Sequence, residues 1–125
     1  MPFDWTDYLT LAEELRQRTD EASLRTAISR GYYAAFHQAR DYLQEELGVS
    51  LSAFGSVHKQ LWREYTNRGR TLRGIGINGD RLNDFRKSAD YDADLANIES
   101  VVESSFHAAN RIFEYMLQIK SKGTS

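Results

Sequence analysis

Apolar residues recur at steps of three and four along most of the chain, which is the spacing of one face of an α-helix. A first helix is predicted over residues 4–18, with Asp4 or Thr6 as its cap. A second is predicted from a cap at Asp20 to a glycine stop at Gly48. Strand signals such as alternating β-branched residues are missing, and the only proline is Pro2. The pattern therefore predicts an all-α protein.

The second half of the chain continues the helical pattern. Further helices are predicted near residues 56–67, around residues 80–91 and from residue 98 to about residue 120. The polar tail, within residues 119–125, is predicted to be disordered. Four or five helices with short connections favour an up-and-down bundle. Because no change of composition marks a boundary, residues 1–125 are predicted to form a single domain.

One stretch, "RGRTLRGIGINGD" at residues 68–80, interrupts this pattern. It has four glycines in thirteen residues, which weakens a helix, and we predict a flexible loop. Its "GIGING" matches the G-x-G-x-x-G of dinucleotide-binding folds, but polar, basic residues precede it where such folds have a buried strand. A groove that binds a nucleotide between Arg68, Arg70 and Arg73 is a further hypothesis, based only on charge and the expected loop.

Composition limits the possible functions only in part. The 125 residues carry 16 basic and 18 acidic side chains, and this balance neither supports nor excludes nucleic-acid binding. There is no cysteine, so disulfides, thiolate metal sites and cysteine nucleophiles are ruled out. No apolar run approaches the roughly 20 residues of a membrane span, and the acidic start does not resemble a signal peptide. We expect a soluble, cytoplasmic protein with no membrane partner.

The segment "SRGYYAAFHQAR" at residues 29–40 is the most informative. Arg30 and His37 are seven residues apart, so a helix places them within roughly 20° of each other and about 10 Å apart along its axis. Tyr33 lies between them on the same face. The aromatic residues here either fill a core or dimer interface, with Arg30 neutralised by an acid, or form a polar groove together with Arg30 and His37. Small residues beside them, among them Gly31 and Ala34, would let another helix approach closely.

A groove of this kind suits a chemistry that uses arginine and histidine without a metal or a thiol. One such reaction is the cleavage of RNA by its own 2′-hydroxyl. A histidine near its ordinary pKa can accept the proton, and a guanidinium can stabilise the charge that develops on phosphorus. The histidines at positions 37, 58 and 107 lie on different predicted helices without the spacing of a helical metal site. We therefore expect no metal and no cofactor.

A second polar strip is "DFRKSADYD" at residues 84–92. Arg86 and Asp90 are spaced to form an ion pair across one helical turn, and Lys87 faces Tyr91 in the same way. The carboxylates here either cap the following helix, which would be a structural role, or take part in function.

The motifs "AISRGYYAAFHQARDYL", "FGSVHKQL" and "FRKSADYD", followed by a long terminal helix, resemble the HEPN superfamily, in particular its small stand-alone branch. The resemblance covers about residues 9–117. It implies an up-and-down bundle that dimerises through a pair of helices. It also implies metal-independent RNase activity with toxin or phage-defence roles, and a minimal nucleotidyltransferase as antitoxin partner.

In catalytic members of that superfamily an arginine, usually followed by a polar residue, precedes a histidine by four to six positions. Here Arg86 occupies the arginine position, but Lys87 follows it and Tyr91 stands where histidine is expected. Tyrosine is a poor base at neutral pH, because its ordinary pKa is near 10. His58 is another candidate base if the second, third and fourth helices come together.

Two functional hypotheses follow. The first is a homodimeric RNase of the HEPN type. The second is a non-catalytic HEPN binding module, which forms a complex with a nucleotidyltransferase or another protein subunit. The candidate catalytic residues are Arg30, His37, Arg86 and Tyr91, and the candidate binding residues are Tyr33, His58, Lys87 and Asp90.

Overall fold

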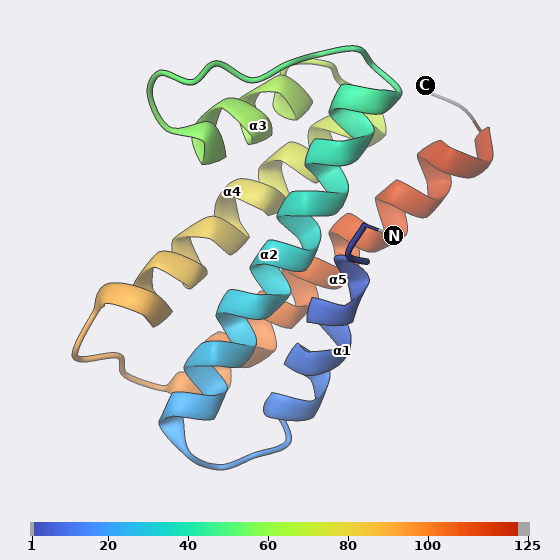
Figure 1. Cartoon of the computed structure of the whole chain (residues 1–125). Helices are drawn as coiled ribbons and strands as arrows, with labels where there is room; N and C mark the ends of the chain where they lie inside the picture. Colours follow the sequence, from blue (N-terminus) through green and yellow to red (C-terminus); the bar gives the residue numbers. More distant parts are fainter. Residues whose placement is uncertain (1, 123–125) are drawn as a thin grey trace.

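The computed structural model describes residues 2–122, and these residues form five α-helices and no strand (Figure 1). The helices are α1 (Thr6–Leu15), α2 (Glu21–Glu45), α3 (Val57–Thr66), α4 (Arg70–Tyr91) and α5 (Ile98–Lys122). The long helices α2, α4 and α5 pack on one another, while α1 lies along α2 and α3 lies across α4. Successive long helices run in opposite directions, so the predicted all-α, up-and-down bundle is confirmed.

Local capping explains where several helices begin. The carboxylate of Asp20 accepts a hydrogen bond from the backbone N–H of Ser23 at 3.0 Å, which confirms the cap predicted for α2. The hydroxyl of Ser56 accepts from the backbone N–H of Lys59 at 3.3 Å and caps α3 in the same way. Beyond the end of α2, Gly48 takes the left-handed backbone conformation (φ 66°) that favours glycine, so the chain turns away there.

The core has two parts. The larger part lies between α2, α3, α4 and α5 and includes the fully buried rings of Tyr32, Trp62 and Tyr65. The smaller part lies around α1 and the other end of the long helices, and it includes the buried side chains of Phe106 from α5 and Ile28 from α2. Many of the aromatic side chains that suggested a dimer interface are therefore buried within one chain.

The glycine-rich stretch is helical from Arg70 onward, so the predicted flexible loop is wrong for residues 70–80; only residues 68–69 lie in the connection between α3 and α4. Gly76 and Gly79 lie on the face of α4 that contacts α3. A Cβ added to Gly76 would stand 2.6 Å from the carbonyl oxygen of Trp62, and one added to Gly79 would overlap the indole of the same residue. The low helix propensity of glycine, about 1 kcal/mol per residue, is offset because only glycine allows α3 to pack this closely.

The predicted tail also needs correction. Residues 119–122 continue α5, and Ile119 is buried in the core. The remaining residues of that tail, 123–125, lie outside the described residues. Within residues 2–122, none of the helices has the length and apolar character that a transmembrane segment requires.

Candidate functional site

Most of the polar residues singled out by the sequence come together on one side of the bundle. Arg30, Tyr33 and His37 project from α2, and Arg86 from α4 lies against the tyrosines of α2. His58 of α3 lies beside the same aromatic rings. The fold thus brings α2, α3 and α4 together, which was the condition for a role of His58.

Arg86 is buried at the centre of this region, with 5% of its surface exposed. Its Nη2 donates to the side-chain oxygen of Asn83 at 2.6 Å, and its Nη1 lies 3.6 Å from a carboxylate oxygen of Asp90. The predicted ion pair across one turn is therefore confirmed. The guanidinium carbon also lies 5.2 Å from the ring centre of Tyr32 and 5.7 Å from that of Tyr33. Its Nε is buried and has no hydrogen-bond partner among residues 2–122.

Asp90 connects the two arginines. The hydroxyl of Ser29 donates to Asp90 at 3.4 Å, and Nη2 of Arg30 donates to that hydroxyl at 3.3 Å. The guanidinium of Arg30 is half-buried between the rings of Tyr8 and Tyr33, at 4.9 and 5.2 Å from their centres. We call Ser29, Arg30, Tyr33, Arg86 and Asp90 the arginine cluster.

His58 is held by a chain of buried hydrogen bonds. The indole N–H of Trp62 donates to the hydroxyl of Tyr32 at 3.0 Å, and that hydroxyl lies 2.6 Å from Nδ1 of His58. Because Tyr32 is fully buried, its proton needs an acceptor, and Nδ1 provides it. The hydrogen-bond partners therefore assign the neutral tautomer in which Nε2 carries the proton. Burial is the main cause that raises the pKa of Tyr32 and keeps its hydroxyl protonated.

This tautomer makes His58 a hydrogen-bond donor. Its lone pair at Nδ1 is occupied by Tyr32, so the free nitrogen, Nε2, can donate a proton but cannot accept one. Burial lowers the pKa of His58, and the positive charges of Arg86 and Lys87 lower it further. His58 is thus suited to bind an acceptor such as a phosphate oxygen, and not to act as a general base.

His37 differs in its surroundings. Its ring is stacked on the indole of Trp5, with centres 3.5 Å apart and planes at 10°. Burial, and then the charge of Arg40, lower the pKa of His37, so it is uncharged at neutral pH. Neither ring nitrogen has a hydrogen bond to another of residues 2–122. Of the two histidines near the arginine cluster, only His37 has a lone pair free to accept a proton.

Tyr91 and Lys87 lie apart from this arrangement. Tyr91 is 77% exposed, and its hydroxyl forms no hydrogen bond with any described residue. Lys87 does not pair with Tyr91, and instead lies 3.7 Å from Asp84, one turn earlier in α4. The fold therefore joins six of the eight candidate residues and leaves the tyrosine at the expected histidine position facing solvent.

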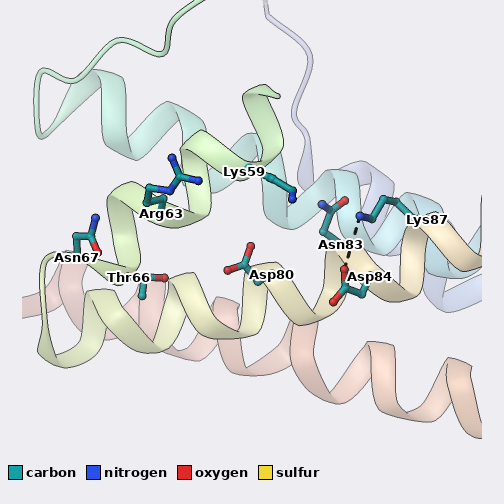
Figure 2. Close-up of a pocket in the computed structure, with 8 residues that line it drawn as sticks. All are labelled: Lys59, Arg63, Thr66, Asn67, Asp80, Asn83, Asp84 and Lys87. Atoms are coloured by element: carbon teal, nitrogen blue, oxygen red, sulfur yellow. Dashed lines mark ion pairs between the residues drawn. The ribbon is translucent and has the colours of Figure 1, made fainter. Parts of the chain in front are cut away.

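A groove between α3 and α4 was missed by the sequence analysis. It encloses about 460 Å³, and Figure 2 shows polar side chains from both helices around it. Burial, and then the nearby Asp84, raise the pKa of Asp80 within it. Arg68, Arg70 and Arg73, the basis of the earlier nucleotide hypothesis, do not line this groove. The lining residues are Lys59, Arg63, Thr66, Asn67, Asp80, Asn83, Asp84 and Lys87.

The i, i+4 spacing of Lys59 and Arg63 was the available signal for this groove. The opposite wall, formed by Asp80, Asn83, Asp84 and Lys87, lies in the helix predicted around residues 80–91, but no spacing in the sequence indicated that this helix packs beside α3. Across residues 2–122, no three histidine, aspartate or glutamate side chains converge as a metal site would require. No family model, curated protein or solved structure gives a significant match to this chain.

Proposed function

We propose that this protein is a metal-independent endoribonuclease of the HEPN type, with His37 as general base and Arg30 as the group that stabilises charge. The supporting observation is that His37 is uncharged at neutral pH, has unoccupied ring nitrogens and belongs to the same helix face as Arg30. An uncharged imidazole and a guanidinium are the two groups that RNA cleavage by the 2′-hydroxyl needs.

In the proposed reaction, His37 accepts the proton of a ribose 2′-hydroxyl, and the 2′-oxygen attacks the neighbouring phosphorus. The bond from phosphorus to the 5′-oxygen breaks, and that oxygen takes a proton from water. The products are a 2′,3′-cyclic phosphate and a 5′-hydroxyl. Arg30 stabilises the negative charge on the phosphorane, because a guanidinium stays charged at all relevant pH values.

The other residues of the arginine cluster have a positioning role, because they hold the side chain of Arg30. Arg86 is too deeply buried to meet RNA in this structure, but it orients Asp90, which holds Arg30 through Ser29. We also propose that two copies pair so that their Arg30 and His37 face one RNA groove. The expected setting is a cytoplasmic toxin or defence system, with a minimal nucleotidyltransferase as antitoxin.

The test is incubation of the purified protein with mixed RNA in EDTA. The wild type is expected to leave 2′,3′-cyclic phosphate ends, and His37→Gln and Arg30→Gln to lower the rate at least 100-fold. The matched control is His107→Gln, because His107 is exposed on α5 and away from the cluster. Equal cleavage by His37→Gln and His107→Gln would refute the proposal.

One observation favours a second function, a non-catalytic module that binds a protein. Arg86 is enclosed and Tyr91 faces solvent, although in catalytic relatives these positions hold the reactive pair. This alternative predicts a folded dimer that cleaves no RNA. It also predicts a stable complex after co-expression with a nucleotidyltransferase encoded beside it, detected as a larger species by light scattering. Tyr91→Ala would then weaken the complex and leave the dimer intact.

A further inference from the structure

Both side chains of the proposed reaction are in contact with aromatic rings of the N-terminal segment. The indole of Trp5 is stacked on the imidazole of His37, and the ring centre of Tyr8 lies 4.9 Å from the guanidinium carbon of Arg30. The rings of Trp5 and Tyr8 also contact each other, with centres 5.6 Å apart. Figure 1 shows α1 running alongside α2 in the opposite direction, so one short stretch of chain reaches both residues of α2. We call Trp5 and Tyr8 the aromatic clamp.

These ring contacts leave unoccupied the atoms that the reaction needs. The nitrogens of an imidazole lie at the edge of its ring, so an indole stacked on the face of His37 does not compete for them. The rings of Tyr8 and Tyr33 attract the charge of the Arg30 guanidinium. Within residues 2–122, the hydrogen bond that Arg30 donates runs from Nη2 to Ser29, and its other N–H groups remain available to a phosphate.

The remainder of α1 holds the segment in place only lightly. Ala12 is the one fully buried residue of this helix, and within residues 2–122 α2 is the only helix along which α1 packs. Just beyond the end of α1, Arg16 donates a hydrogen bond to Glu103 of α5 at 3.0 Å. The start of the helix instead contacts α2 through the rings of Trp5 and Tyr8. The clamp therefore fixes the segment and the two α2 side chains against each other.

Fixing these two side chains in advance has a consequence for the reaction. A long arginine side chain loses many rotamers when it binds a phosphate in one orientation. A catalytic group misplaced by about 1 Å can lower a rate about 100-fold. Because the rings already hold the guanidinium and the imidazole, less freedom is left to lose when RNA binds.

We propose that Trp5 and Tyr8 are positioning residues of the RNA-cleavage reaction, which hold His37 and Arg30 in the orientation that one phosphodiester requires. This inference rests on the proposed function. The two rings neither take nor give the protons that move in the reaction. The clamp stays in place while RNA is bound, so the N-terminal segment is part of the site.

Steady-state cleavage of mixed RNA in EDTA by the full chain tests this role. A leucine substitution keeps apolar bulk but removes the flat ring, so we expect Trp5→Leu and Tyr8→Leu to lower kcat about 10- to 100-fold with little change in KM. Trp5→Phe and Tyr8→Phe keep a ring and should retain most of the activity. The matched control is Leu11→Ala, a 40% exposed residue of α1 outside the clamp, which should cleave as the wild type does.

A second measurement does not depend on cleavage. The heteronuclear NOE of the Arg30 Nε–H reports how far this side chain moves on the picosecond to nanosecond timescale. It should be high in the wild type and in Leu11→Ala, and lower in Tyr8→Leu. An equally high value in Tyr8→Leu would show that the ring does not hold Arg30 and would overturn the role of Tyr8.

The outcomes separate this inference from the proposed function. A higher rate in the leucine variants would make the segment a lid that has to leave before RNA enters, and that result overturns the positioning role. Rates equal to that of Leu11→Ala, or equal losses in the leucine and phenylalanine variants, overturn it as well. Cleavage that requires His37 but not the two rings refutes this inference alone. A folded wild type that cleaves no RNA refutes the proposed function, and the positioning role with it.

Discussion

The imidazole of His37 lies flat on the indole of Trp5, with ring centres 3.5 Å apart and planes at 10°. Trp5 precedes α1, and its own neighbours are Phe3 and Tyr8, so an aromatic cluster of the N-terminal segment covers this part of α2. The candidate general base is thus shielded on one face of its ring by a residue 32 positions earlier in the chain.

Trp5→Ala is expected to raise the pKa of His37 toward its ordinary value of 6.5, because burial is the main cause that lowers this pKa. The pKa is measured from the imidazole proton resonances in an NMR titration. Phe3→Ala is the control, since Phe3 contacts Trp5 but has no ring contact with His37. Equal shifts in the two variants, or no shift in Trp5→Ala, would contradict shielding by the indole.

The free energy of unfolding is expected to fall as the pH decreases through about 6.5. Both His37 and His58 have a pKa lower in the folded state than in the unfolded chain. At a pH between the folded-state and the unfolded-state pKa of each histidine, the unfolded chain binds more protons than the folded protein, so acid favours unfolding. Above the unfolded-state pKa, the stabilising contribution of both histidines is fully present. Urea denaturation at pH 7.5 and pH 5.5 measures the difference. The difference in the free energy of unfolding between the two pH values should be smaller in His58→Gln and unchanged in His107→Gln. An undiminished difference in His58→Gln would contradict a lowered pKa of His58 in the folded state.

Gly79→Ala is expected to destabilise the protein by about 1–3 kcal/mol, although alanine favours a helix, because the new Cβ would overlap the indole of Trp62. Gly31→Ala is the matched control. It is also a buried glycine within a helix, and its Cβ would stand 3.9 Å from Ala12, an ordinary contact. We expect Gly31→Ala to be neutral or stabilising by up to about 1 kcal/mol. Thermal or urea denaturation compares the two, and equal stability would disprove the close approach of α3.

Arg86→Met should destabilise the fold by about 1–3 kcal/mol, because the side-chain oxygen of Asn83 loses its partner while remaining buried. Replacing both partners removes this unpaired oxygen, so Arg86→Met combined with Asn83→Leu should recover much of the loss. Denaturant titration of the two single variants and the double variant forms the cycle. Strictly additive losses would show that the two side chains do not interact.

Local sequence signals predicted much of this structure. The helical periodicity, the cap at Asp20 and the pair between Arg86 and Asp90 involve residues within four positions of one another, and all three are present. The first half of α4 was missed because the low helix propensity of its glycines led to the prediction of a loop. The contacts of Gly76 and Gly79 with Trp62, which favour a helix there, involve a residue of another helix. The groove was missed although both of its walls lie in predicted helices, because the sequence carried no signal for the packing of α3 against α4.

Contacts between distant segments had no signal in the sequence. Nothing in the spacing of residues indicated that Trp5 would cover His37, or that Tyr32 would fix the tautomer of His58. The prediction that Arg30 and His37 lie on the same face of one helix was correct, because the angle between two residues of a helix depends only on its pitch. The groups that surround that face depend on tertiary packing.

The glycines of α4 also determine how rigid the neighbouring groove is. Because the indole of Trp62 and the backbone at Thr66 meet Gly79 and Gly76 directly, α3 has no freedom to slide along α4 or to draw away from it without losing these contacts. The spacing between the two walls of the groove is therefore set by the backbone before any ligand arrives. A ligand there would meet a receptor that is already shaped, and only the ends of its long side chains would lose freedom on binding.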